Sequence, residues 1–136
     1  MSKTTLDQER ARHAWDAVQE AKKAKKDKDH DPKKYGGQAK KLPIRIIASG
    51  LGSALAFLKG KGYAPELVKD LSGWIAKQMP PTSKGTSNGE SDDLLGRIIH
   101  GDSDFLRWAT DETLAYLQWL NRFAEAEGLT DDENGN

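Results

Sequence analysis

The 136-residue chain contains no cysteine and no long hydrophobic run. Without cysteine it has no disulfide framework, no thiolate zinc site and no cysteine nucleophile. Its most apolar run, from Ile46 to Phe57, lies between Arg45 and Lys59. That run is shorter than the roughly 20 residues that a bilayer-spanning helix requires. Because the N-terminus MSKTTLDQER also lacks the apolar segment of a signal peptide, we expect a soluble, cytoplasmic protein without membrane contact.

The chain also has no net charge, but its N-terminal half is positively charged and its C-terminal half is negatively charged. Residues 1–61 contain fifteen Lys+Arg and seven Asp+Glu, a net charge of +8. Residues 62–136 contain six and fourteen, a net charge of −8. This asymmetry indicates either an anionic partner for the basic half, or complementary packing between the halves or between neighbouring subunits.

Apolar residues recur with helical spacing along the whole chain, and no segment alternates with the period of a strand. Thr5 and Gln8 form the pattern of a capping box at the start of the first helix. Further helices are predicted to begin near Tyr35, at Ser53 and Pro65, around Leu94 and after Asp102. We therefore predict an all-α fold, a compact single-domain bundle of five to six helices.

Three segments are too polar to belong to the core. They are a lysine-rich connection at about 22–34, a mobile loop at about 80–91 and a frayed acidic tail at about 129–136. Pro32 is predicted to lie after the end of the first helix. Pro43 is expected to kink the second helix or to lie in its first turn.

Helical spacing also predicts which side chains face the core. In the second helix these are Ala39, Leu42, Ile46 and Ile47. Ile99 is assigned to a short fifth helix, and Leu106 to the shared apolar face of the sixth. The four tryptophans, Trp15, Trp74, Trp108 and Trp119, are predicted to pack in the core because bulky aromatic residues dominate core energetics.

Signals of catalysis are weak. The glycines of GLG and KGKG do not match a phosphate-binding loop, because Gly62 stands where that loop needs Ser or Thr. His30 lies in a charge run, and His13 is expected to pair with Asp16 on the surface. His100, Asp102 and Asp104 allow a small helical hydrolase as an alternative, although Asp102 is expected as a helix cap. We predict no catalytic residue, no metal site and no cofactor.

Basic residues flank the apolar segment and form the candidate RNA-binding site. Lys40, Lys41 and Arg45 precede the glycine turn, and Lys59 and Lys61 follow it. A patch of this kind is typical of contact with the phosphate backbone without reading of bases. Weaker candidates are the lysines that end the first helix, where cations also suit the helix dipole: Lys22, Lys23 and Lys25. The alternative is a protein-interaction scaffold whose cations meet acidic partner surfaces and never RNA.

Three segments in order carry a resemblance to a known family: LDQERARHAWDAV (6–18), KKLPIRIIASGLGSALAFL (40–58) and DLLGRIIHGDSDFLRWATDETLAYLQWLNRFAEAE (93–127). They closely resemble the small α-helical subunit of the type III-B CRISPR effector, the Cmr complex. Before GLG, that family often has a polar run such as Arg-Thr-Asn, where this chain has Ile47-Ala48-Ser49. This difference leaves Lys41 and Arg45 as the expected contacts.

The resemblance implies a subunit without nuclease activity of its own that takes part in antiviral defence. In that family, copies of the small subunit stack into a minor filament beside the backbone subunits, and together they hold the crRNA and its target RNA. Target cleavage belongs to the backbone subunits, and DNA cleavage and cyclic nucleotide synthesis belong to the large subunit. The implied partners are therefore the backbone and large Cmr subunits, further copies of this chain, crRNA and target RNA.

Overall fold

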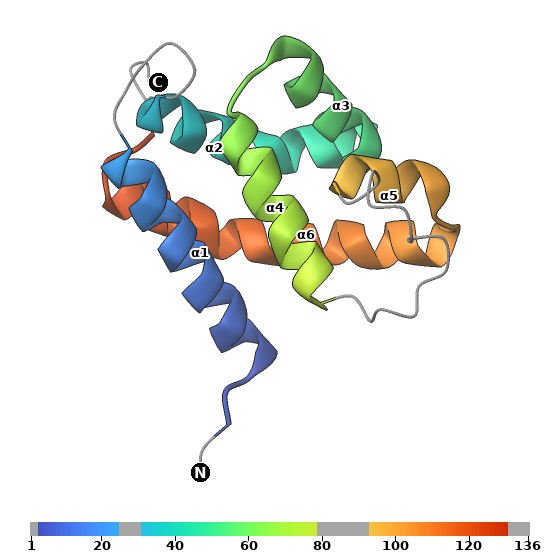
Figure 1. Ribbon diagram of the computed structural model, residues 1–136, viewed down its shortest axis with the longest axis horizontal. Coiled ribbons are helices and arrows are strands. Elements are labelled where there is room, and N and C mark those ends of the chain that lie inside the picture. The colour runs from blue at the N-terminus through green and yellow to red at the C-terminus, as the bar shows by residue number, and fades with distance from the viewer. Residues whose placement is uncertain (1–2, 25–30, 79–92, 131–136) are drawn as a thin grey trace.

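The computed structural model describes residues 3–24, 31–78 and 93–130 (Figure 1). All regular structure in these ranges is helical, which confirms the predicted fold class. The helices are α1 (Leu6–Lys23), α2 (Pro32–Ser49), α3 (Leu51–Lys61), α4 (Pro65–Gln78), α5 (Leu94–His100) and α6 (Ser103–Ala126). Over the described ranges, the helices include none that is long and apolar enough to cross a membrane.

The longest helix, α6, organises the bundle (Figure 1). Helices α1, α2 and α4 pack against α6, while α3 and α5 pack against each other and against α4. One core joins all six helices. Its largest fully buried side chains are Trp74, Tyr35, Tyr116, Leu42, Leu51, Leu55, Leu58, Leu67, Leu71, Ile75, Leu94 and Leu117.

Side-chain caps begin α1 and α6 where the sequence predicts them. The Gln8 amide donates to Thr5 Oγ1 at 3.0 Å, and the Thr5 amide donates to Gln8 Oε1 at 2.8 Å. These two bonds are the predicted capping box of α1. Asp102 caps α6, since its Oδ1 accepts from the Phe105 amide at 2.8 Å.

Helix α2 begins earlier than predicted, at Pro32 instead of near Tyr35. Asp31 caps it by accepting from the Lys33 amide at 3.0 Å, and proline suits the first helical position because no intrahelical donor is needed there. The predicted lysine-rich connection at 22–34 therefore overlaps the end of α1 and the start of α2. Residues 25–30 of that connection, the predicted loop at 80–91 and residues 131–136 of the predicted tail lie outside the described residues.

Pro43 lies in the interior of α2 and not in its first turn. Proline has no N–H, so the Ala39 carbonyl four residues earlier loses its intrahelical donor. Asn121 of α6 replaces that donor, because its Nδ2 donates to the Ala39 carbonyl at 3.0 Å. The helix therefore continues to Ser49, and a buried carbonyl stays paired.

The glycine junction between α2 and α3 is confirmed at Gly50, whose φ is +93°. Helix α3 starts directly afterwards at Leu51, two residues before the predicted Ser53, so Gly52 lies inside the helix. Close packing against the backbone of Leu129 requires glycine at a second position, Gly36. A Cβ there would lie 2.2 Å from the Leu129 carbonyl oxygen, which no side chain tolerates.

Some side chains predicted to face the core are exposed. Ile47 is 76% exposed, because consecutive helical residues point about 100° apart and its neighbour Ile46 occupies the core position. Leu106, on the predicted apolar face of the last helix, also lies partly in solvent. Among the tryptophans, Trp74 is buried, whereas Trp15 is 42% exposed and rests edge-on against Phe123. Spacing identified the helices correctly but overestimated the width of their buried faces.

Candidate nucleic-acid interface

One side of α2 is basic. Lys34, Gln38, Lys41 and Arg45 follow one another at intervals of four, three and four residues, which places them along one side of a helix. Arg45 Nη1 donates to Gln38 Oε1 at 2.8 Å, and Gln38 is itself buried. The guanidinium is therefore held in a fixed position at the surface.

The end of α3 brings two aromatic rings to the same side. Gly62 adopts a left-handed conformation with φ of +69°, and its amide donates to the Lys59 carbonyl at 3.2 Å. The Tyr63 amide donates to the Leu58 carbonyl at 3.0 Å, which completes a Schellman motif. This reversal sets the Tyr63 ring against Phe57, with ring centroids 6.1 Å apart and planes at 73°.

Three cations lie beside these two rings. Arg45 Cζ lies 4.4 Å and Lys61 Nζ 5.8 Å from the centroid of Phe57, and Lys34 Nζ lies 4.5 Å from that of Tyr63. We refer to Lys34, Arg45, Phe57, Lys61 and Tyr63 as the basic–aromatic cluster. None of its three cations forms an ion pair with a carboxylate of the described chain.

The structure brings together only some of the cations predicted to bind RNA. Arg45 and Lys61 meet at Phe57, and Lys41 is exposed one turn before Arg45. Lys59 points elsewhere, because residues two apart on a helix lie on nearly opposite sides. It pairs at 3.1 Å with Asp93, the cap of α5, beside a groove of about 820 Å³ between α3, α4 and α5.

The remaining candidates lie away from the cluster. Lys40 lines a pocket of about 300 Å³ against α6, together with Arg122 and Glu125. Lys22 pairs with Glu127 at 2.7 Å, and Lys23 is exposed at the end of α1. Lys25 lies outside the described residues.

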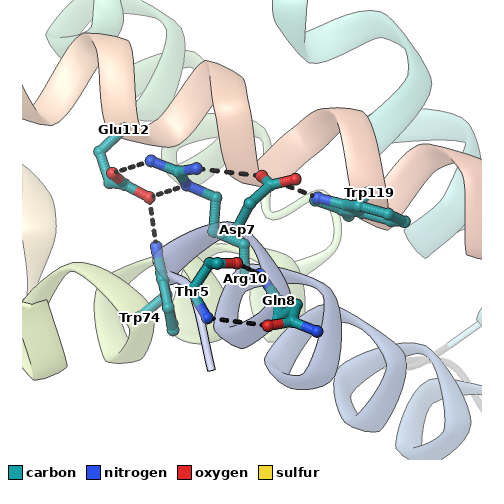
Figure 2. Close-up of polar contacts among 7 residues, drawn as sticks. All are labelled: Thr5, Asp7, Gln8, Arg10, Trp74, Glu112 and Trp119. Atoms are coloured by element: carbon teal, nitrogen blue, oxygen red, sulfur yellow. Dashed lines mark hydrogen bonds and ion pairs between the residues drawn. The ribbon is translucent and has the colours of Figure 1, made fainter. Parts of the chain in front are cut away.

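A second charged group of residues lies where α1, α4 and α6 meet, with Glu112 buried and Asp7 exposed (Figure 2). Arg10 donates to both oxygens of Glu112, at 2.6 Å from Nε and 2.8 Å from Nη2, and Trp74 Nε1 donates to Glu112 Oε2 at 2.9 Å. Asp7 Oδ1 accepts from Arg10 at 3.0 Å and from Trp119 at 3.1 Å. Each charge has a partner, so this group ties three helices together.

The acidity of Glu112 reflects these contacts. Burial alone would raise the pKa of Glu112, but hydrogen bonds from Arg10 and Trp74 outweigh it and hold that pKa below its usual value. A carboxylate held ionised in this way is a poor general acid or base at neutral pH. The arrangement is that of a structural ion pair.

His13, predicted to lie on the surface, is half-buried and faces the same interior. Its Nδ1 lies 2.7 Å from the Tyr116 hydroxyl, and its ring centroid lies 5.2 Å from that of Trp74. Burial lowers the pKa of His13, so the imidazole is neutral at physiological pH. No local pattern signals these partners, since Tyr116 is 103 residues away in the sequence.

The residues of the hydrolase alternative form no site. His100, Asp102 and Asp104 are all exposed, and Asp102 is engaged as the cap of α6. Over the ranges 3–24, 31–78 and 93–130, no group of three His, Cys, Asp or Glu side chains could hold a metal ion. His30 lies outside those ranges.

Three members of the cluster escape sequence reasoning: Lys34, Phe57 and Tyr63. The sequence pattern places the start of α2 three residues late, which assigns Lys34 to the connection. The signal that could have found it is Asp31-Pro32, a cap followed by a first-turn proline. Phe57 belongs to an apolar run in the sequence, although only its neighbours Leu55 and Leu58 are buried.

Two comparisons with known proteins agree with this architecture. The sequence model of the CRISPR-associated protein family Cas_Cmr5 matches residues 6–127. The fold is similar to the crystal structure of a CRISPR-associated Cmr5 family protein from Thermus thermophilus, with a TM-score of 0.70 and 26% sequence identity. That similarity covers 94% of this chain and 100% of the other. The chain therefore belongs to the Cmr5 family, the small α-helical subunits of the type III-B CRISPR effector complex.

Proposed function

We propose that this chain is a non-catalytic subunit that helps to hold crRNA and target RNA through their phosphates and stacks with further copies of itself. The observation that carries the RNA contact is the set of cations on one side of α2 and α3. Arg45 and Lys61 converge on Phe57, Lys41 is exposed beside them, and no described carboxylate neutralises them.

The chemistry of these side chains suits phosphate oxygens. The guanidinium of Arg45 has five N–H donors, and the structure uses one of them in its bond to Gln38. The others remain available to an anion that approaches from solvent. Contacts of this kind are independent of base sequence, as a subunit that serves any guide RNA requires.

Charge reversal tests the RNA contact. Lys41→Glu combined with Lys61→Glu should weaken binding of a short guide–target RNA duplex and flatten its salt dependence by about one unit of slope per lost phosphate. The matched control reverses two exposed lysines elsewhere, Lys23 and Lys77. Both variants change the net charge equally, so a difference between them reports position. Fluorescence anisotropy across a salt series measures both quantities.

Equal affinities and equal salt slopes in the two variants would overturn the RNA contact. In that case the second candidate, a scaffold that binds only protein, would account for the patch. Circular dichroism is the control for folding. It should show the same helix content in both variants because exposed charges contribute about 0–1 kcal/mol each.

A specific observation supports protein docking at a separate place on α2. Ile44 and Ile47, three residues apart, are 73% and 76% exposed, although large apolar side chains are seldom left so open at adjacent helical positions. We assign this apolar pair to the contact with another Cmr subunit or a further copy of the chain. Ile44→Gln with Ile47→Gln should abolish incorporation into a reconstituted complex, while RNA affinity of the isolated chain, whose charge is unchanged, falls less than twofold. Normal incorporation would contradict the assignment.

A further inference from the structure

The basic–aromatic cluster contains more than phosphate contacts require. Phe57 is 37% exposed and is not among the buried side chains of the core. Its ring lies beside Arg45, Lys61 and Tyr63. A partly exposed ring with two cations beside it is a poor surface for docking another protein core.

We infer that Phe57 and Tyr63 form a stacking site for an unpaired base of single-stranded RNA, and that Lys34, Arg45 and Lys61 hold the adjacent phosphates. Proteins that bind single strands combine a basic surface along the backbone with aromatic side chains on which bases stack. In this chain, the basic–aromatic cluster supplies both the cations and the aromatic side chains. The inference rests on the proposed RNA contact and adds the class of RNA that the site prefers.

The geometry gives each component a defined position. The two rings lie with planes at 73°, so they present faces in different directions, and the Schellman turn at Gly62 fixes their separation. Arg45 is restrained by Gln38, which reduces the entropy lost when RNA binds. A paired base would be shielded within its duplex, so only an unpaired base can use the rings.

The position of the cations beside the rings has a simpler explanation, and the experiment must distinguish it from base stacking. Lysine and arginine side chains often rest on exposed rings as cation–π pairs, with no ligand involved. Such pairs would make Phe57 a support for Arg45 and Lys61. Substituting the ring would then weaken binding of every polyanion, whether or not it carries bases.

Phe57→Leu and Tyr63→Leu remove one aromatic face each and leave all cations in place. The full chain is titrated at low salt with three labelled ligands of equal length: single-stranded RNA, duplex RNA and an abasic phosphodiester strand. Loss of one stacked base should weaken single-strand binding by about fivefold to 100-fold. Duplex and abasic binding should change less than twofold. Trp15→Leu, which alters an exposed ring away from the cluster, is the matched control and should change none of the three.

A spectroscopic measurement accompanies the affinities. An RNA strand with a single 2-aminopurine should change its fluorescence when it binds the wild type, and this change should disappear in Phe57→Leu at saturating protein. Equal losses for all three ligands, or no loss in either variant, would overturn the stacking site but leave the phosphate contact standing. Failure of the wild-type chain to bind any of the three ligands would overturn the proposed RNA contact as well.

Discussion

The buried network around Glu112 and the basic–aromatic cluster use arginine in opposite ways. Arg10 has both of its acidic partners within 3.0 Å, and its side chain is 18% exposed. Arg45 meets an amide oxygen and the face of a ring, and no described carboxylate pairs with it. A guanidinium whose charge is fully matched contributes to the fold. A guanidinium at the surface that has no carboxylate partner is available to bind another molecule.

The two regions also differ in what they connect. The network joins residues more than one hundred positions apart and thereby fastens α1 to α6. The cluster joins the side of α2 to the end of α3, two helices that already adjoin through Gly50. Damage to the first should therefore appear in stability, and damage to the second in binding. Measuring both quantities on each variant separates the two regions.

The largest effect is expected from Glu112→Leu. It removes the acceptor of Arg10 and Trp74 and leaves the largely buried Arg10 with the exposed Asp7 as its remaining acidic partner. Breaking a buried ion pair in this way costs up to about 3–5 kcal/mol. The midpoint of urea unfolding, followed by far-UV circular dichroism, should fall accordingly. Asp111→Leu, at an exposed neighbouring position on α6, should change it little. RNA affinity of the folded Glu112→Leu protein should match that of the wild type.

Glu112→Gln refines this prediction. Glutamine keeps an oxygen for Trp74 but loses the charge that matches Arg10, so its stability should lie between those of the wild type and Glu112→Leu. If all three proteins unfolded at the same urea concentration, the ion pair would not be what fastens α1 to α6. The network around Glu112 and the basic–aromatic cluster would then not differ in their contribution to stability.

A smaller, pH-dependent effect is expected at Asp70, a partly buried carboxylate that accepts from the Tyr35 hydroxyl at 2.6 Å. Burial raises the pKa of Asp70 to about 6, although the bond from Tyr35 opposes the shift. A folded pKa above the unfolded value stabilises the fold below the unfolded pKa, and this contribution disappears as the pH rises through the folded pKa. Wild-type stability should therefore lose about 1–3 kcal/mol from this group between pH 4 and pH 7.

Asp70→Asn isolates that contribution, because asparagine stays neutral and can still accept from Tyr35. The two proteins should be about equally stable near pH 4, and the variant should be the more stable above pH 6. The comparison is made as a difference because the lowered pKa of His13 gives the opposite slope in both proteins. Parallel stability curves across this range would show that Asp70 is ionised at no cost in the folded state.

Local patterns account for most of the fold and little of the site. The capping box at Thr5, the cap at Asp102 and the elbow at Gly50 each depend on residues within a few positions, and all three are predicted from the sequence. The helix order follows from apolar spacing for the same reason. The pairing of Arg10 with Glu112 follows no local pattern, so sequence reasoning misses it.

The candidate site is predicted in part, with a recognisable cause for each omission. The sequence singles out Arg45, Lys61 and Lys41 because they flank an apolar segment. Lys59 is selected on the same ground, yet its helical angle turns it toward Asp93. Phe57 is absent because a phenylalanine in an apolar run is expected in the core. Only the packing of α2 beside α3 shows that this ring faces cations.

The smallest effect is expected from Lys22→Gln. Lys22 is a sequence candidate for RNA binding, but it pairs with Glu127 at 2.7 Å, with half of its side chain exposed. Exposed pairs of this kind contribute about 0–1 kcal/mol, so the unfolding midpoint should barely move. RNA affinity should not change either, since the charge of Lys22 is already matched.

Lys41→Gln is the paired comparison, because it removes the same charge from an exposed lysine beside the cluster. It should leave stability equally unaffected but flatten the salt dependence of RNA binding by about one unit of slope. Anisotropy titrations of both variants at several salt concentrations measure the difference. Equal losses of affinity would mean that binding follows total positive charge. Lysines with and without a carboxylate partner would then contribute equally to RNA binding, and the two regions would not differ in function.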